Sequence, residues 1–309
     1  MKDLLSIGSL TPKEFFGLIN LAEKIKKNPN KYKNKLFEKT LLTMFEAPSL
    51  RTRISFEVAM TQLHGETINF QTEHSPWGIG KETIEDVAKT ISQYCDLMAA
   101  RIYSHEELVK LAKYASIPVI NMMTNHGHPC QILGDFLTIK EHLKRTKKIK
   151  ITYLGDANNN VTYSLLQACA ITGNTLAIAC PHTTEYYPQK RFIVESNYLC
   201  KKYGGSFIIT NNPKEAIKDA DIVYTDSWMS YRIPKEEKTR RKKELKNFRV
   251  TKELFSLAKK TAYFMHCLPA NRDHEVAHEV IDGPRSIVFP QARNRMFIQK
   301  AILLELMKK

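Results

Sequence analysis

The fold of this chain is decided by a stretch that begins Thr40-Leu41-Leu42-Thr43-Met44-Phe45 and continues a few residues later with Ser49-Leu50-Arg51-Thr52-Arg53. The first segment is a short run of apolar and β-branched residues, which is typical of a buried strand. A helical pattern of apolar residues then extends over residues 54–63. A strand that leads through a short loop into a helix is the repeating unit of α/β proteins.

The same alternation of strand and helix continues through the rest of the chain. In the first half, further strands are predicted near residues 67–70, 97–101 and 119–122. A second series starts at residue 150, and its later strands are predicted near residues 176–180, 206–210, 222–225 and 263–266. Because strands that are joined by helices pair in parallel, both halves predict parallel sheets with helices on both faces.

The boundary between the two series predicts two domains. A helix predicted over residues 131–144 ends in a basic run, so we place the boundary at about residues 140–149. The expected fold class is α/β, with two doubly wound parallel-sheet domains joined by long helices. The first domain is expected to span residues 1–140, with a C-terminal helix at 291–309 packing back on it, and the second to span 149–290. A single large α/β domain is an alternative that the length of 309 residues leaves open.

The net charge of +15 limits the classes of partner. A basic chain can bind nucleic acid, an anionic membrane or a small anionic substrate. No RNA- or DNA-binding signature accompanies the basic runs, and no apolar run approaches the length needed to span a membrane. We therefore expect neither a nucleic-acid partner nor a membrane, and we interpret runs such as residues 238–243 as solvated surface.

The six cysteines are scattered, without the spacing of a zinc site or of a disulfide framework. Free thiols in a chain of this size suggest a reducing compartment, and no signal peptide is visible at the N-terminus. A cytoplasmic location is expected. The sequence also contains neither a Walker-type loop nor a Gly-x-Gly-x-x-Gly motif, so the α/β pattern does not imply ATP or NAD.

Four motifs follow predicted strands, at the end of the sheet where open α/β proteins bind ligands. The first is Ser49-Leu50-Arg51-Thr52-Arg53, which opens a helix. A helix N-terminus, two hydroxyl groups and a bidentate arginine suit a phosphate group. The alternative is an ordinary capped helix with two surface arginines.

The other three motifs carry polar groups of complementary chemistry. His126-Gly127-His128-Pro129-Cys130-Gln131 offers a histidine and a glutamine that can bond a carbonyl oxygen and an amide nitrogen. Asp226-Ser227-Trp228-Met229-Ser230 offers a carboxylate for an ammonium group, and His266-Cys267-Leu268-Pro269-Ala270 can turn carbonyl groups toward a ligand. Taken singly, each also fits a structural role, as a structural histidine, a turn aspartate or an inert buried thiol.

Taken together and in this order, the four motifs resemble the aspartate/ornithine carbamoyltransferase family over essentially the whole chain. The ornithine branch usually carries Ser-Thr-Arg-Thr-Arg, His-Pro-x-Gln, Asp-x-Trp-x-Ser-Met-Gly and His-Cys-Leu-Pro, whereas the aspartate branch has His-Pro-Gly-Pro as its fourth motif. The resemblance implies transfer of the carbamoyl group of carbamoyl phosphate to the δ-amine of L-ornithine, held at the junction of two domains. It also implies no cofactor, no metal, and a homotrimer or a multiple of trimers with shared active sites.

The resemblance assigns roles to individual residues. The carbamoyl phosphate side is expected to comprise Ser49, the N–H of Leu50, Arg51, Thr52, Arg101, His128, Gln131, Cys267, the carbonyl of Leu268, and Arg295. Arg101, His128 and Cys267 are the expected catalytic residues, with His128 polarising the carbamoyl oxygen. The ornithine side is expected to comprise Asn160, Asp226, Ser230 and Tyr231. Arg53 is expected to pair with a carboxylate such as Glu46 or Glu82.

Several positions depart from the pattern of the ornithine branch, mostly on the acceptor side. Leu50 replaces a threonine, and Trp77 lies in a loop that reaches a neighbouring subunit in the family. Tyr231-Arg232 replaces Met-Gly, and Arg293 replaces a glutamate. Relatives that use acylated ornithines carry a tryptophan near position 77. An N-acyl-ornithine or putrescine as acceptor, and a catalytically inactive regulatory relative, therefore remain alternatives. The direction of flux, toward citrulline or away from it, is also open.

Overall fold

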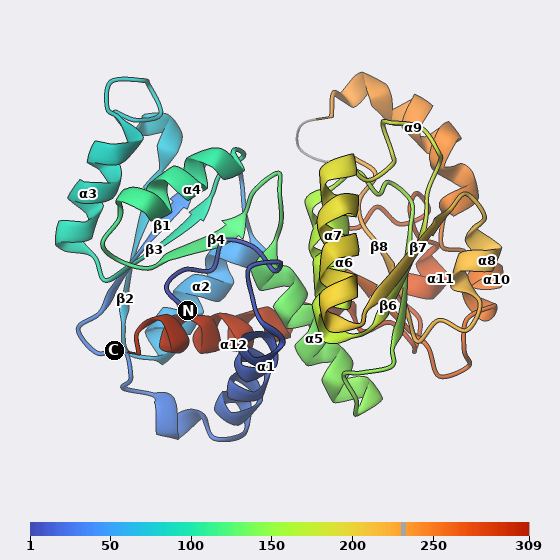
Figure 1. Cartoon of the computed structure of the whole chain (residues 1–309), viewed down its shortest axis with the longest axis horizontal. Helices are drawn as coiled ribbons and strands as arrows, with labels where there is room; N and C mark the ends of the chain where they lie inside the picture. Colours follow the sequence, from blue (N-terminus) through green and yellow to red (C-terminus); the bar gives the residue numbers. More distant parts are fainter. Residues whose placement is uncertain (230–232, 309) are drawn as a thin grey trace. The chain divides into compact units, whose positions relative to one another are not determined.

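The structure is a computed structural model that describes residues 1–229 and 233–308. Backbone contacts divide the chain into two compact units (Figure 1). Unit 1 comprises residues 1–137 and 293–309, and unit 2 comprises residues 138–292. Both boundaries fall within helices, one in α5 (Pro129–Leu143) and the other in α12 (Val288–Leu306).

Unit 1 is built on a four-stranded parallel sheet with the order β2-β1-β3-β4. The strands are β1 (Thr40–Phe45), β2 (Glu66–Gln71), β3 (Leu97–Arg101) and β4 (Val119–Met123). The central strand β3 is buried along its whole length, whereas the edge strand β2 is largely exposed. Such a gradient of burial is expected when helices cover both faces of the central strands.

Helices cover the two faces of the unit 1 sheet. They are α1 (Pro12–Lys27), α2 (Arg51–Gln62), α3 (Ile84–Tyr94), α4 (His105–Tyr114) and parts of α5 and α12, with short 3-10 helices η1 (Pro29–Tyr32) and η2 (Thr72–His74). Figure 1 shows α3 and α4 together on one face and α1, α2 and α12 toward the other. α1 begins with a capping box in which Thr11 and Glu14 bond each other's backbone N–H groups.

Unit 2 contains a five-stranded parallel sheet with the order β7-β6-β5-β8-β9. Its strands are β5 (Lys150–Leu154), β6 (Thr175–Ala179), β7 (Ser206–Thr210), β8 (Ile222–Thr225) and β9 (Tyr263–His266). Its helices are α6 (Asn160–Thr172), α7 (Lys190–Tyr203), α8 (Pro213–Ile217), α9 (Lys238–Leu245), α10 (Lys252–Ser256) and α11 (His278–Ile281), with 3-10 helices η3 (Lys235–Glu237) and η4 (Lys246–Phe248). α6 and α7 pack together along one face of this sheet (Figure 1).

The predicted fold class is confirmed, since both sheets are parallel and helices alternate with strands along the chain. Within each sheet the carboxyl ends of the strands lie at one edge, where α/β proteins bind ligands. In unit 1 that edge carries the loops that follow Phe45, Arg101 and Met123. In unit 2 it carries the loops that follow β5, β8 and β9.

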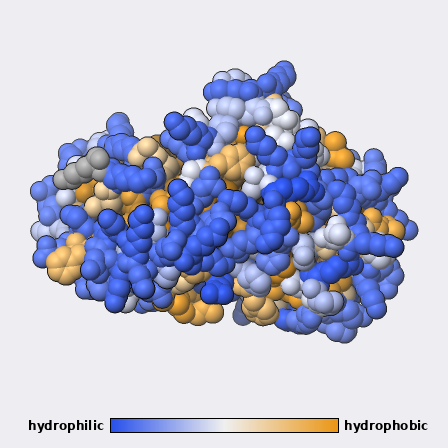
Figure 2. All heavy atoms as spheres, turned by 90° about the horizontal axis from the view of Figure 1, so that it is seen from below, coloured by the Kyte–Doolittle hydropathy of each residue, from blue (hydrophilic) through white to orange (hydrophobic). Residues whose placement is uncertain are grey.

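The surface agrees with the charged composition. Figure 2 shows mostly hydrophilic side chains over the visible face, with apolar ones in small groups. None of the helices in the part of the chain that the structure describes is both long and apolar enough to cross a membrane.

Two glycines provide a test of the packing of these units. A Cβ added at Gly205 would lie 2.3 Å from the carbonyl oxygen of Cys169 and 2.5 Å from the Cα of Ala170, so the backbone itself would have to move. Overpacking of this kind costs about 1–3 kcal/mol or more. Gly17 lies inside α1 with nothing within 4 Å of an added Cβ. We expect Gly205→Ala to lower the free energy of unfolding and Gly17→Ala to raise it by about 0.5–1 kcal/mol, as measured by thermal or urea unfolding. A neutral or stabilising Gly205→Ala would contradict this packing.

Candidate active site

The loop between β1 and α2 is held by Glu46. The N–H of Glu46 donates to the carbonyl of Arg101 at 3.0 Å, and its Oε2 accepts from the N–H of Tyr103 at 2.6 Å. These two bonds join the loop after β1 to the loop after β3. The segment that carries the first motif is thereby fixed next to the strand end that carries Arg101.

The first turn of α2 has no side-chain cap. Leu50 occupies the N-cap position and makes no side-chain cap hydrogen bond, and its own side chain is 68% exposed. A leucine can therefore stand at this position without a packing conflict, and any ligand contact there is made by the backbone. Thr52 is buried in the first turn, and Ser49 and Arg51 beside it are half-buried. Donors at a helix N-terminus favour an anion.

Arg295 joins two of the predicted ligand groups. Its guanidinium is buried and donates to Thr52 Oγ1 at 2.7 Å and to Gln131 Oε1 at 2.9 Å. Gln131 in turn donates through Nε2 to Asp135 Oδ1 at 2.8 Å. An added Cβ at Gly134 would lie 3.5 Å from the Cα of Arg295, which shows how closely α5 and α12 approach there. The sequence predicted these groups separately, and the structure brings them into one hydrogen-bonded cluster.

His128 is buried among three arginines. Burial lowers its pKa well below the ordinary value of 6.5, and the charges of Arg295, Arg101 and Arg51 lower the pKa further. The imidazole is therefore neutral at pH 7. Arg101, the last residue of β3, is itself buried. Unit 1 thus gathers predicted ligands from three strand-end loops and from α12 around one neutral histidine.

Arg53 does not pair as expected. Its Nε donates to Glu57 Oε1 at 3.0 Å, one turn along the same helix, and not to Glu46 or Glu82. Glu57 also accepts from Asn69 Nδ2 at 2.7 Å. The expected loop contact is wrong because the nearer i,i+4 partner on α2 is available.

Trp77 lies in a loop whose shape is fixed from within unit 1. Its half-buried side chain packs against the apolar cluster formed by β1, β3, α3 and α4. A Cβ at Gly78 would lie 1.8 Å from the carbonyl oxygen of Thr72, and the N–H of Gly78 donates to Ser75 Oγ at 3.0 Å. Gly78 therefore permits the turn that places Trp77. The expected contact of this loop with a neighbouring subunit stays a prediction.

In unit 2, the third and fourth motifs meet. The thiol of Cys267 donates to Asp226 Oδ1 at 2.9 Å, and the same oxygen accepts from the N–H of Ser227 at 2.7 Å. Cys267 follows β9 and Asp226 follows the adjacent strand β8, which is why the two side chains lie together. Both are half-buried, so a ligand can reach them.

A buried histidine shapes the turn after Cys267. Leu268 has a φ of +58° and is followed by a cis peptide bond to Pro269, and its N–H donates to His266 Nδ1 at 2.8 Å. Because Nδ1 accepts this bond, the ring proton lies on Nε2, which faces Glu275 Oε1 at 3.4 Å. Both of these side chains are fully buried. The sequence predicted neither partner role for Glu275 nor a structural role for His266.

Asp226, His266 and Cys267 are also the group of described residues whose chemistry suits a metal ion. Their ligand atoms lie within 4.8 Å of one another. Each of the three is, however, already bonded within the protein, Cys267 to Asp226 and His266 to Leu268. Hydrogen bonding therefore accounts for the cluster, and the expectation that the site needs no metal stays a prediction.

The acceptor-side loops are tied together by Arg241. Its guanidinium is buried, donates to the carbonyl of Trp228 at 2.8 Å and to Glu185 Oε1 at 2.7 Å, and pairs with Asp156. Burial raises the pKa of Asp156 to about 6 although the charge of Arg241 opposes the shift, so the carboxylate is ionised at neutral pH. Arg241 thus links the loop after β5 to the loop after β8. It belongs to a basic run that we interpreted as solvated surface, and for this residue the interpretation is wrong.

Two further observations concern the predicted ornithine ligands. Asn160 is the first residue of α6, whose N-cap Asn159 accepts from the N–H groups of Val161 and Thr162, both at 2.9 Å. A Cβ at Gly155, which has a φ of +116°, would lie 2.7 Å from Trp228 Nε1, so this glycine allows the indole to lie against the loop. The predicted ligands Ser230 and Tyr231, and Arg232 beside them, lie outside the described residues.

The comparisons with known proteins agree along the whole chain. Residues 2–141 match the carbamoyl-P binding domain of aspartate/ornithine carbamoyltransferase, and residues 147–306 match the Asp/Orn binding domain. The chain is 43% identical to ornithine carbamoyltransferase of Methanosarcina acetivorans over 99% of both chains. It is 44% identical to that of Caldicellulosiruptor saccharolyticus over 98% of both.

Solved structures lead to the same family. The ornithine carbamoyltransferase from Pyrococcus furiosus is 41% identical and superimposes with a TM-score of 0.92, covering 98% of this chain and 96% of that one. Ornithine transcarbamoylase from Giardia lamblia is 38% identical with a TM-score of 0.90, covering 99% and 97%. These matches agree with the four motifs and with their placement at strand ends. The chain is therefore a carbamoyltransferase and belongs to the aspartate/ornithine carbamoyltransferase family.

Proposed function

We propose that this protein transfers the carbamoyl group of carbamoyl phosphate to the δ-amine of L-ornithine, giving L-citrulline and phosphate. The observation that carries the proposal is the cluster in unit 1, in which Arg295 bonds Thr52 and Gln131 beside a neutral His128. The names of the relatives, which are ornithine carbamoyltransferases, support ornithine as the acceptor.

The groups in unit 1 suit carbamoyl phosphate. The uncapped first turn of α2, with Ser49, Arg51 and Thr52, binds the phosphate, and the buried Arg101 contacts both the phosphate and the carbonyl oxygen. The neutral imidazole of His128 donates a hydrogen bond to the carbonyl oxygen, and Gln131 holds the carbamoyl nitrogen. Preorganised donors of this kind stabilise the negative charge that develops on the oxygen in the transition state.

The groups in unit 2 suit an α-amino acid. The carboxylate of Asp226 and the side chain of Asn160 bind the α-amino and α-carboxylate end, with Ser230 and Tyr231 as further ligands. The thiol of Cys267 and the carbonyl of Leu268 line the place where the neutral δ-amine attacks. A nitrogen–carbon bond forms, the bond from carbon to the phosphate oxygen breaks, and the phosphate leaves with the electron pair while the amine loses a proton.

These assignments give each domain one substrate to bind. Residues 1–140 with the C-terminal helix at 291–309 bind carbamoyl phosphate, and residues 149–290 bind the amino acid, as the descriptions of the two matched domains support. Both half-sites act on one pair of substrates in the cytoplasm, without a metal or cofactor.

A homotrimer, or a multiple of trimers, is part of the same proposal. Exposed apolar side chains on α2 and on the edge strand β2 support a subunit contact there: Leu50 is 68% exposed, and Ile54 and Ile68 are each 49% exposed. Apolar groups beside an open sheet edge favour association. The loop that carries Trp77 follows β2 and would lie next to that contact.

The experiment that tests this function is a ureido-product assay with purified protein and carbamoyl phosphate. L-ornithine, N-acetyl-ornithine, N-succinyl-ornithine and putrescine are offered separately, with phosphate release followed in parallel. Turnover with L-ornithine, and far less with the others, is the expected result. Turnover only with an acylated ornithine or with putrescine would move the specificity to Trp77 and the loop at residues 230–232. The absence of turnover with every acceptor would overturn the proposal.

Variants of two arginines on α12 distinguish the role of Arg295 in the cluster from a general effect of positive charge. Arg295→Gln removes the guanidinium that bonds Thr52 and Gln131, whereas Arg293→Gln changes an exposed residue two positions away. We expect Arg295→Gln to lower kcat/KM for carbamoyl phosphate by about 10²–10³, the scale for loss of one preorganised donor. Arg293→Gln should stay near the wild type in the same steady-state assay. Equal losses of kcat/KM in the two variants would contradict a specific role of Arg295 in the cluster.

Neighbouring arginines on α9 provide a matched pair for the acceptor side. Arg241→Lys keeps the charge but loses the planar fork that reaches Asp156, Glu185 and the carbonyl of Trp228. Misplacement of the acceptor loop by about 1 Å can cost about 10² in rate, so we expect kcat/KM for ornithine to fall on that scale. Equilibrium binding of carbamoyl phosphate should not change.

The control is Arg240→Lys, which alters an exposed arginine in surface ion pairs and should have little effect. If Arg241→Lys weakened carbamoyl phosphate binding and ornithine use equally, Arg241 would serve general stability and not the acceptor loop.

A further inference from the structure

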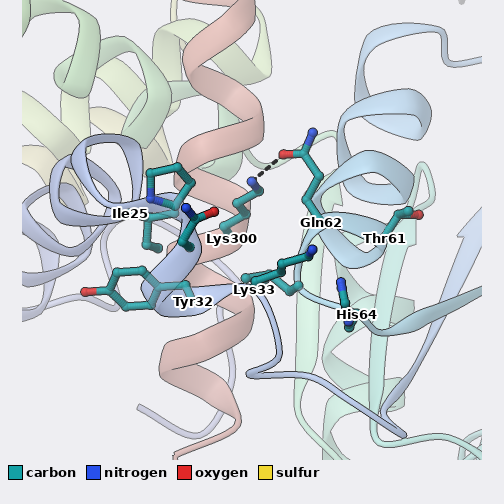
Figure 3. Close-up of a pocket in the computed structure, with 10 residues that line it drawn as sticks. Ile25, Tyr32, Lys33, Thr61, Gln62, His64 and Lys300 are labelled. Atoms are coloured by element: carbon teal, nitrogen blue, oxygen red, sulfur yellow. Dashed lines mark hydrogen bonds between the residues drawn. The ribbon is translucent and has the colours of Figure 1, made fainter.

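A cavity of about 420 Å³ lies in unit 1 at residues to which the carbamoyl transfer assigns no role. It is bordered by the end of α1 with η1, by the end of α2, and by α12 (Figure 3). Three basic side chains line it, from Lys33, His64 and Lys300, and none of its described lining residues is acidic. A volume of this size is within the range of small-molecule sites.

Lys300 is the unusual member of this lining. The residue is only 3% exposed, and burial lowers the pKa of its ammonium group. The ammonium donates to Gln62 Oε1 and lies 5.5 Å from the ring centroid of Phe297. No carboxylate in the described part of the chain pairs with it. Buried charges are normally neutralised by a partner of opposite sign, so a cavity beside such a lysine suits an anion.

The other walls of the cavity add a second cation and an apolar side. Figure 3 shows Lys33 and Lys300 between Tyr32 on one side and Gln62 and His64 on the other. Lys33 is exposed, so its ammonium group can move to meet a ligand. Ile25 is buried and Tyr32 is half-buried, and both line the cavity.

The C-terminal ends of two helices border the cavity, and their partial negative charge disfavours an anion. The C-termini of α1 and α2 each carry about half a negative charge. Their carbonyl groups are already bonded, because Lys24 O accepts from Asn28 N–H, and Met60 O and Thr61 O accept from the backbone that follows α2. These partial charges help to keep Lys300 protonated. The two lysines still leave the cavity with a net positive charge.

We propose that this cavity binds a small organic anion, with its carboxylate or phosphate group between Lys300 and Lys33 and its apolar part against Ile25 and Tyr32. The volume exceeds what a single inorganic anion fills, and the tyrosine ring and isoleucine side chain provide a surface for an organic group. The occupant is bound and not transformed.

Competitive lysine labelling tests this site directly. The purified full-length protein is treated with a trace of acetic anhydride, and acetylation of each lysine is quantified by peptide mass spectrometry. Inorganic phosphate, phenyl phosphate and benzoate are the probes, so that phosphate, carboxylate and the organic group are compared separately. At a concentration about ten times the dissociation constant, labelling of Lys300 and Lys33 should fall about tenfold. Phenyl phosphate or benzoate should protect at lower concentration than inorganic phosphate.

Controls separate this site from the surface and from the candidate active site. Lys31 lies on the short helix η1, two residues before Lys33, but does not line the cavity, so its labelling should not change. Lys300→Met should abolish the protection of Lys33, and Tyr32→Ala should weaken protection by phenyl phosphate while sparing that by inorganic phosphate. Arg101→Met should leave the protection intact, because Arg101 belongs to the other site.

Three results would overturn the proposal. They are no protection by any probe, protection of Lys33 that persists unchanged in Lys300→Met, and protection that disappears in Arg101→Met. The last result would show that the probes act through the candidate active site. If Lys300→Met does not fold, the effect of Tyr32→Ala on phenyl phosphate decides.

Discussion

The buried guanidinium of Arg295 is the interaction on which the phosphate-side half of the site depends. A buried cation is costly unless it is hydrogen-bonded, and here Nη2 of Arg295 donates to Thr52 at the start of α2 and Nη1 donates to Gln131 at the start of α5. These partners are 243 and 164 residues away in the sequence. The last helix of the chain therefore fixes the relative positions of two strand-end loops. The same charge helps to keep His128 neutral, which is the state that the proposed chemistry needs.

In unit 2, too, side chains from distant elements hold the loops that carry the ligand groups. Glu275 and Gln291 hold His266, which accepts the N–H of Leu268 and so orients the turn beside Cys267. Arg241 on α9 holds the loops after β5 and β8. In both units the loops at the carboxyl ends of the strands carry the ligand groups, while a charged or polar side chain from a more distant element sets their conformation. This separation explains how exposed loops can present groups in a fixed arrangement.

Much of this structure is predictable from the sequence. Short β-rich runs alternate with helical patterns, and the strands fall where these runs predict, as at residues 97–101 and 206–210. The strand-end positions of the four motifs follow from the same alternation. The roles of Glu275 and Arg241, and the partner of Arg53, were not predictable. Their partners lie at no regular spacing, and a buried arginine in a basic run has the same local sequence as an exposed one.

The environment of Lys300 was also not predictable from the sequence. On sequence alone it is one lysine among the 47 lysines and arginines of a basic chain. Only the fold shows that it is buried, that its partner is the neutral amide of Gln62, and that a cavity lies beside it. Burial without a counter-charge cannot be inferred from residue type, since lysine is almost always exposed.

The protonation of His128 is the most direct test of the central claim that buried arginines converge on a neutral histidine. The protein is labelled with ¹³C in the histidine rings, the resonance of His128 is assigned by comparison with His128→Gln, and its chemical shift is followed by NMR from pH 8 to pH 5.5. Burial and three nearby cations disfavour the added proton, so the pKa of His128 in the folded protein should lie well below 6.5. The resonance of His128 should stay at the chemical shift of the neutral ring as the pH falls through 6.5. A midpoint at or above 6.5 would show that the buried arginines do not hold the ring neutral.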